Sequence, residues 1–210
     1  MRPAGMSPQE WVILMKRFRF RRSSFFAIIA AALIAYGYFS GSGRQDPATT
    51  PAVAPVTVPG KSSIEGPYFS DRDRVADRIV AAINHTQHTL DIAVYSITQP
   101  GIAAAIEAAH RRGVQVRIVT DAGQALDRHS EDSYLRAEGV PIRLSGGFRG
   151  ARSLMHNKFA VFDGEVAETG SYNWTTSATG YNFENAVFIR DPEVSNRYEE
   201  EFQHLWAQAR

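Results

Sequence analysis

Patterns typical of helices and of strands alternate along residues 64–210 of this 210-residue chain. Amphipathic stretches with helical spacing are separated by short apolar runs that are typical of buried strands. The expected helices cover residues 72–84, 102–112, 130–138 and 192–208, and the expected strands cover residues 90–97, 114–120, 141–144 and 185–189. Because helices and strands that alternate in this way pack in layers, the pattern predicts an α/β fold, a sandwich of helices on both faces of a mixed β-sheet.

The composition divides the chain into four segments. Residues 64–210 have the usual length of a single domain with its own core. Residues 40–63 are rich in Pro, Ala and Thr, which is typical of an extended linker. Residues 1–24 are basic, and residues 25–39 form an uncharged apolar run. This layout indicates a signal anchor or a cleaved signal peptide, so we expect the domain outside the cytoplasm, either membrane-anchored and facing the periplasm or extracellular side, or released if the segment is cut.

The charge balance is uneven along the chain. The whole sequence has 23 Lys and Arg against 22 Asp and Glu, but residues 64–210 have 15 against 20, a net charge of 15 − 20 = −5. That sign does not favour bulk electrostatic binding of nucleic acid. No acidic residue lies between Gly139 and Phe162, where Arg149, Arg152 and Lys158 are found. If the Gly-rich loop 145–150 lies over a site, Arg149 and Arg152 would bind an anionic substrate at its rim; the alternative is a flexible, solvated loop.

A short polar pattern at residues 156–164 indicates where the chemistry lies. His156 and Lys158 are two residues apart, so on an extended strand both side chains point to the same face. An imidazole and an ammonium group would then share one phosphate-sized site. The alternating residues that follow predict a strand that ends in a two-residue hairpin turn at Asp163 and Gly164.

The returning strand of this hairpin leads to a second polar group. Gly170, Ser171 and Asn173 form a small, polar stretch suited to a loop whose side chains face a ligand. Glu184 then precedes another apolar strand.

Taken together, the spacing His-x-Lys-x4-Asp, then Gly-Ser-x-Asn, then Glu resembles the HKD signature of the phospholipase D superfamily. Within it, the chain is most similar to single-motif members, the bacterial Nuc-type endonucleases and the mitochondrial cardiolipin-hydrolase type. The resemblance covers about residues 64–210. It implies a phosphodiesterase that needs no metal or other cofactor.

The resemblance also implies a role for each candidate site residue. His156 attacks phosphorus to form a phosphohistidine, and a second histidine protonates the leaving group. Lys158 and Asn173 bind the phosphate oxygens, while Ser171 and Glu184 orient the imidazole. Asp163 belongs to the signature but is better suited to a structural role at its turn. Because one chain carries a single motif, the expected enzyme is a homodimer with one site across its two-fold axis.

The remaining histidines give no sign of a metal site. His85, His88, His110, His129 and His204 have no Cys or carboxylate partner at the spacing of a metal site. Three functions stay open at this point. An exported endonuclease of low sequence specificity that acts on nucleic acid is favoured by the likeness to Nuc-type proteins. A phospholipase D that acts on membrane phospholipid is favoured by the N-terminal apolar segment and the acidic domain. A binding module without activity is disfavoured by the complete motif.

Overall fold

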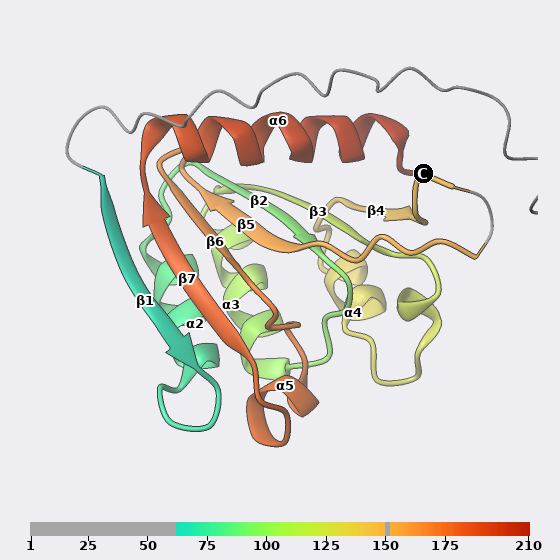
Figure 1. Cartoon of the computed structure of the whole chain (residues 1–210). Helices are drawn as coiled ribbons and strands as arrows, with labels where there is room; N and C mark the ends of the chain where they lie inside the picture. The colour runs from blue at the N-terminus through green and yellow to red at the C-terminus, as the bar shows by residue number, and fades with distance from the viewer. Residues whose placement is uncertain (1–61, 150–151) are drawn as a thin grey trace, which may run out of the picture. The chain divides into compact units, whose positions relative to one another are not determined.

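The computed structural model describes residues 62–149 and 152–210. The described part of the chain forms a seven-stranded sheet with the order β1-β7-β6-β5-β2-β3-β4 (Figure 1). The strands are β1 (Ser63–Phe69), β2 (Thr89–Val94), β3 (Gln115–Asp121), β4 (Ile142–Ser145), β5 (Lys158–Phe162), β6 (Val166–Gly170) and β7 (Asn185–Arg190). β2, β3 and β4 run parallel, and all other neighbours are antiparallel. The prediction of a mixed sheet is confirmed.

Helices cover both faces of this sheet, as predicted. α2 (Val75–His85), α3 (Pro100–Arg111) and α4 (Asp132–Ala137) lie on one face, and α6 (Pro192–Gln208) crosses the other (Figure 1). α6 contacts the strands β2 to β7. The short helix α5 (Thr176–Gly180) and a 3-10 turn (Gln124–Leu126) lie in the connecting segments.

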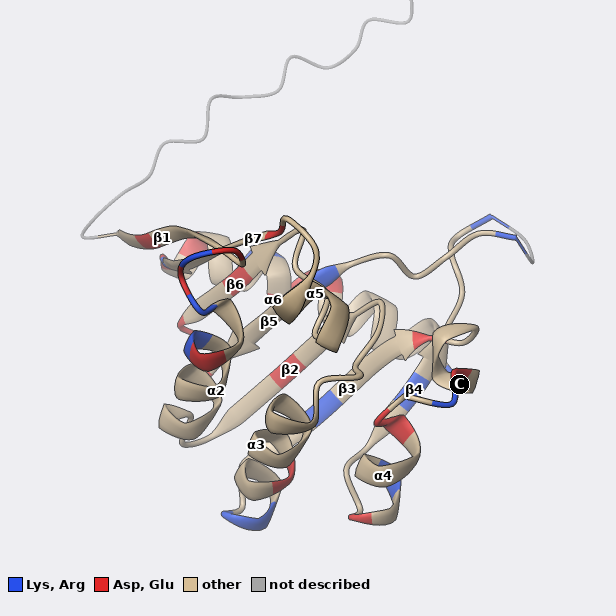
Figure 2. Cartoon of the chain, turned by 90° about the horizontal axis from the view of Figure 1, so that it is seen from below, with Lys and Arg blue, Asp and Glu red and all other residues tan. Residues whose placement is uncertain are grey.

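The central strand β2 is buried on both faces because each face meets a helix layer. Leu90, Ile92 and Val94 belong to the larger core beneath α2 and α3, whereas Ala93 belongs to the smaller core beneath α6. Asp91, which points toward α6, forms an ion pair of 2.7 Å with Arg117 on β3. Figure 2 shows this acidic position on β2 beside the basic position on β3. Burial raises the pKa of Asp91 to about 6, although the hydrogen bond from Arg117 opposes the rise.

Local signals explain where the long elements end. Gly113 follows α3 with a φ of 93°, a conformation that glycine adopts without strain and that commonly terminates a helix. The Asp191 carboxylate caps α6 by accepting hydrogen bonds from the N–H groups of Glu193 and Val194. With Pro192 in the first turn, this cap fixes the start of α6, whose bounds agree with the predicted 192–208.

The main differences between the structure and the sequence predictions lie in β1, in α5 and in the hairpin turn. β1, which pairs with β7, begins at Ser63, one residue inside the predicted linker, and neither β1 nor α5 was expected. The predicted hairpin forms, but the prediction of a two-residue turn is wrong. Phe162 pairs with Val166, so Glu165 is an additional unpaired residue in the loop. Asp163 and Gly164 still hold the two turn positions, with φ values of 53° and 68°.

The predicted basic, apolar and linker segments before residue 62 lie outside the described residues. Within residues 62–149 and 152–210, no helix is both long and apolar enough to cross a bilayer.

Candidate active site

Two backbone anchors hold His156 at the start of β5. On one side, the N–H of Met155 donates to the buried Asp121 carboxylate at 3.0 Å. On the other, the N–H of Tyr95 donates to the carbonyl of Asn157 at 2.8 Å, which continues the pairing between β2 and β5. The segment is therefore fixed while the His156 side chain is exposed to solvent. An exposed imidazole on a fixed backbone can meet a substrate without a change of fold.

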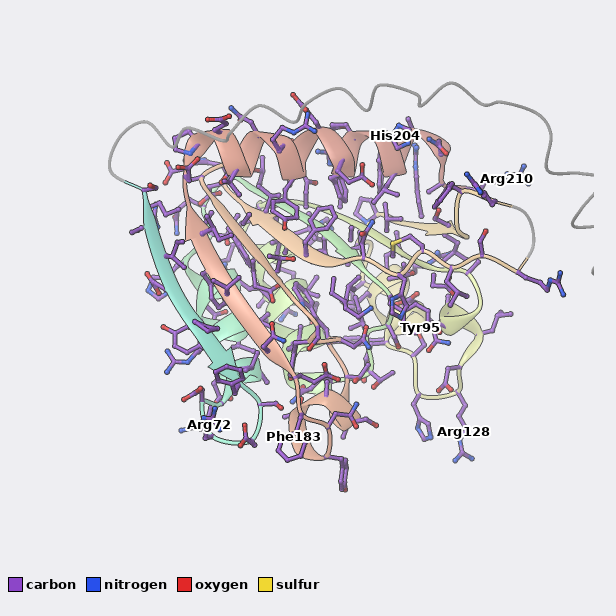
Figure 3. The ribbon with its side chains drawn as sticks, in the orientation of Figure 1. Arg72, Tyr95, Arg128, Phe183, His204 and Arg210 are labelled. Carbon is purple, nitrogen blue, oxygen red and sulfur yellow. The ribbon has the colours of Figure 1, made fainter. Side chains whose placement is uncertain are left out.

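The Tyr95 ring brings His156 and Lys158 together, as their spacing predicted. It lies on the loop after β2 (Figure 3), with its centroid 4.8 Å from the His156 ring and 5.2 Å from Lys158 Nζ. Lys158 Nζ also donates to the His156 carbonyl at 2.8 Å. Burial lowers the pKa of Lys158, and the charge of Glu184 opposes this effect. The site thus has a half-buried cation beside an exposed imidazole.

Ser171 and Glu184 form a pair that joins the end of β6 to the start of β7. Ser171 Oγ donates to the Glu184 carboxylate at 2.6 Å and accepts from the N–H of Asn185 at 3.1 Å. Gly170 permits this close approach, because a Cβ atom there would lie 2.1 Å from the Asn185 carbonyl oxygen. Within the described residues of one chain, neither member of the pair hydrogen-bonds the His156 ring, so their predicted role in orienting it stays a prediction.

Asn173 presents a polar side chain between two buried aromatic residues. Tyr172 and Trp174 are fully buried, and their packing holds the loop that carries Asn173. The Asn173 side-chain oxygen is buried and has no hydrogen-bond partner among the described residues. Its amide nitrogen is the group that can donate to a phosphate oxygen.

Asp163 lies away from this cluster. It follows the last residue of β5, whereas Lys158 is the first, so about five residues of extended chain, roughly 16 Å, separate them. Its carboxylate accepts hydrogen bonds from the N–H groups of Gln87, His88 and Thr89 at 2.7 to 3.2 Å. Asp163 thus ties the turn to the segment before β2, in agreement with a structural role; a catalytic role for it is disfavoured by its position.

Comparison with known proteins assigns this chain to a protein family. A family model described as "Cardiolipin synthase, PLD-like domain" matches residues 79–206. A mitochondrial cardiolipin hydrolase from Xenopus tropicalis is 36% identical over 163 residues, which cover 76% of this chain and 73% of that protein. The chain belongs to the phospholipase D superfamily. It is an enzyme of the class that hydrolyses phosphodiester bonds.

Further members of the phospholipase D superfamily agree with this placement. The human mitochondrial cardiolipin hydrolase is 34% identical, with 62% of this chain and 50% of that protein covered. The crystal structure of a phospholipase D family member, Nuc from Salmonella typhimurium, matches with a TM-score of 0.64 and 32% identity, covering 71% of this chain and 97% of that one. NucT from Helicobacter pylori, at 24% identity and a TM-score of 0.63, shares the fold.

The Gly-rich loop lies beside the phospholipase D signature, as one alternative predicted. A cavity of about 810 Å³ is lined by the His156 side of the site, by Gly147 and Phe148 of this loop, and by Leu205 on α6. Arg149 and Arg152 are exposed but do not line that cavity. Their binding of substrate stays a prediction.

Two residues that position the site were not singled out from the sequence. Tyr95 falls within the predicted strand 90–97, and Asp121 directly follows the predicted strand 114–120. A polar or aromatic residue at the end of a parallel strand is the signal that could have identified both, because ligand sites gather at that edge. Among the described residues, no group of three His, Cys, Asp or Glu side chains could hold a metal ion.

Proposed function

We propose that this chain hydrolyses phosphodiester bonds of nucleic acids, with low sequence specificity, through a phosphohistidine formed on His156. The observation that carries the proposal is the exposed His156 imidazole beside Lys158 at one edge of the sheet, with the Asn173 amide on the following loop. One group can attack phosphorus, and the other two can bind the equatorial oxygens, whose negative charge must be stabilised.

The reaction proceeds in two balanced steps. In the first, an imidazole nitrogen of His156 attacks phosphorus, the bond to the leaving oxygen breaks, and that oxygen takes a proton from a second imidazole. In the second, water attacks the phosphohistidine, gives its proton back to the second imidazole, and releases His156 and a phosphomonoester. Lys158 supplies positive charge in both steps. Because burial lowers the pKa of Lys158, its ammonium group loses its proton at a lower pH than that of an ordinary lysine, so activity should decline in alkaline solution.

The second imidazole is proposed to come from a second copy of the chain. One chain carries a single His-x-Lys motif, whereas the reaction needs two imidazoles. The surface near Glu184 exposes apolar side chains that a partner could cover, with Tyr181 85% and Phe183 89% exposed. Phe183 lies at the lower end of the molecule in Figure 3, on the segment between α5 and β7. In this homodimer the Ser171–Glu184 pair would orient an imidazole across the interface. Sedimentation should give a dimer at assay concentrations, and an active monomer would contradict the assignment.

Nucleic acid is the preferred substrate because the fold and the surface both suit it. The likeness to Nuc covers nearly all of that protein, and the exposed ring of Phe148, which lines the cavity beside His156, can stack on bases. The net charge of −5 in residues 64–210 predicts binding that depends on local contacts rather than on a broad basic surface.

A phospholipase D activity on membrane phospholipid is the second candidate. It is supported by the relatives named mitochondrial cardiolipin hydrolase and by the exposed apolar side chain of Phe148, which could enter a bilayer surface.

Parallel assays separate these two candidates. The full chain, in mild detergent, is incubated with and without EDTA with plasmid DNA, single-stranded DNA and RNA, and phospholipid vesicles, with His156→Ala as the blank. Nucleic acid cleaved only by the wild type supports the proposal. Released head groups with intact nucleic acid would transfer the assignment to phospholipid, and complete loss of activity with EDTA would contradict the metal-independent mechanism.

Membrane attachment and export belong to the proposal as well. They rest on the basic and apolar segments at residues 1–24 and 25–39. Fractionation of cells that express the full chain tests them, because a protein found only in the soluble cytoplasmic fraction would contradict both.

A further inference from the structure

Glu168 is a buried acidic side chain that the proposed reaction does not use. It lies in the middle of β6, two residues before Gly170, opposite Ala160 on β5 and Phe188 on β7. All of these neighbours belong to the apolar core beneath α2 and α3. Glu168 is fully buried, and neither carboxylate oxygen has a regular hydrogen-bond partner among the described residues. A buried carboxyl group without such a partner is costly, so its presence calls for a reason.

The indole of Trp174 is the polar group that approaches this carboxyl. Its N–H is also buried without a regular partner in the described part of the chain. Burial raises the pKa of Glu168 to about 8, and the interaction with the Trp174 indole opposes that rise. The Trp174 indole therefore lies in the same core as the neighbours of Glu168, where it can interact with the carboxyl group. Near neutral pH the carboxyl is mostly protonated, which suits an apolar site.

Trp174 in turn connects two loops of the active site. It directly follows Asn173, and its carbonyl accepts hydrogen bonds from the N–H groups of Thr98 and Gln99 at 2.9 and 3.1 Å. It also forms a bridge with Ile97, which lies two residues after Tyr95. A displacement of Trp174 would thus move both the amide that binds phosphate and the ring that packs on His156.

We propose that Glu168, in its neutral form, is a positioning residue that holds Trp174 and thereby Asn173 and Tyr95 in place, and that loss of its proton disturbs this arrangement. A charged Glu168 would have no ion-pair partner, since none of the salt bridges in the described residues includes it. The effect on turnover rests on the proposed function, but the effect on the indole does not.

The other ionisable groups near this site cannot compensate the charge. The Tyr172 hydroxyl, which hydrogen-bonds Thr179 at 2.6 Å, has its pKa raised mainly by burial. Negative charges at Glu168, Asp77 and Glu184 add to that rise. An ionised Glu168 would therefore meet a neutral phenol rather than a cation at Tyr172, and its charge would disturb the interaction with the Trp174 indole.

The test follows the indole N–H of Trp174 by NMR. The ¹⁵N-labelled full chain, in detergent micelles, is titrated from about pH 6 to about pH 10, and Trp174→Phe identifies the signal. The expected result is a shift with a midpoint near pH 8 in the wild type and none in Glu168→Gln, which cannot ionise. Glu165→Gln is the matched control, because Glu165 lies on the same hairpin but is exposed and paired with Arg190. A wild-type indole signal that does not titrate would overturn the Glu168–Trp174 contact, whatever the variants do.

Turnover over the same pH range tests the positioning role. Between pH 7 and pH 9 the wild type should lose about tenfold in kcat, as expected for a group about 90% ionised one unit above its pKa, while Glu168→Gln keeps its activity until Lys158 deprotonates. Superimposable profiles for the wild type and Glu168→Gln would overturn the positioning role. A chain whose indole titrates but which cleaves no phosphodiester would support the contact and contradict the proposed function instead.

Discussion

β5 is flanked by the first and last residues of the His-x-Lys-x4-Asp pattern, His156 and Asp163, and the surroundings of these two residues differ. At the first end, the His156 ring is exposed, the Lys158 cation is half-buried, and the nearby Asn173 oxygen has no partner among the described residues. At the second end, the Asp163 carboxylate accepts hydrogen bonds from three backbone N–H groups.

One short motif thus serves both chemistry and stability. Polar groups that lack partners inside the protein can gain them from a substrate, and this makes them useful for binding and catalysis. Polar groups whose partners are all internal stabilise the fold but have little left for a ligand. Substitutions at the two ends should therefore have opposite consequences for activity and stability.

The largest expected effect is that of His156→Ala on turnover. Removing the nucleophile should lower kcat by about 10⁴-fold or more, while the melting temperature changes little, because the side chain is exposed. Initial rates and a thermal unfolding curve of the same preparation measure both. A variant that retains substantial activity would refute His156 as the nucleophile.

Lys158→Ala should have the second largest effect. Loss of one cation that stabilises the phosphoryl oxygens typically lowers kcat by about 10² to 10³-fold. Because Lys158 is only half-buried and its Nζ bonds a carbonyl, stability should fall modestly. Lys158→Arg, which keeps the charge but not the geometry, is the comparison variant. Equal kcat values for wild type and Lys158→Ala would contradict the role of Lys158 in stabilising the phosphoryl oxygens.

Asp163→Ala should lower the stability of the fold and leave kcat nearly unchanged, the opposite of the two substitutions above. Leaving three backbone donors without their acceptor should cost about 1 to 3 kcal/mol of unfolding free energy, with kcat of the folded enzyme close to wild type. Denaturant unfolding measures the free energy, and kcat is measured at denaturant concentrations below the unfolding transition. A large loss of kcat with unchanged stability would show that the two ends of β5 are not separated in function.

The stabilising effect of Asp163 should also depend on pH. Burial alone would raise its pKa, but the three backbone hydrogen bonds more than offset this, so the pKa of the folded protein is lowered. Its contribution is therefore complete above the unfolded-state pKa of about 4 and is lost as the pH falls through the lower, folded-state value. The stability gap between wild type and Asp163→Ala should narrow below about pH 4; a constant gap would contradict this origin.

A smaller, stoichiometric effect is expected from mixed subunits. If equal amounts of wild type and His156→Ala exchange subunits freely, about half of the wild-type chains enter mixed dimers, which contain only one copy of His156. Total activity should then fall to about half that of the wild type alone. Activity that is unchanged by the inactive chain would indicate that each chain carries a complete site.

Much of this arrangement could be predicted from local sequence patterns. Apolar runs placed β2, β3 and β7 within a few residues, alternating residues placed β5, and the helical pattern of residues 192–208 placed α6. The spacing of two residues placed His156 and Lys158 on one side, where Tyr95 now contacts both.

The parts that could not be predicted depend on contacts between distant segments. β1 contains Gly66 and Pro67, which weaken a strand pattern, and it forms because β7 offers an unpaired edge. Tyr95 and Asp121 acquire their roles only when the ends of β2 and β3 meet the start of β5. The extra residue in the hairpin arises from pairing across the strands, which the turn residues alone do not specify.

The most direct test of the central claim is to trap the covalent intermediate. The full chain is mixed with bis(4-nitrophenyl) phosphate in EDTA, quenched in alkali within the first turnover, digested and analysed by mass spectrometry. The predicted result is a burst of one nitrophenolate and a 4-nitrophenylphosphoryl group on the peptide that contains His156, with neither seen in His156→Ala. Turnover with an unmodified His156 peptide at every quench time, or an adduct on another residue, would contradict the account.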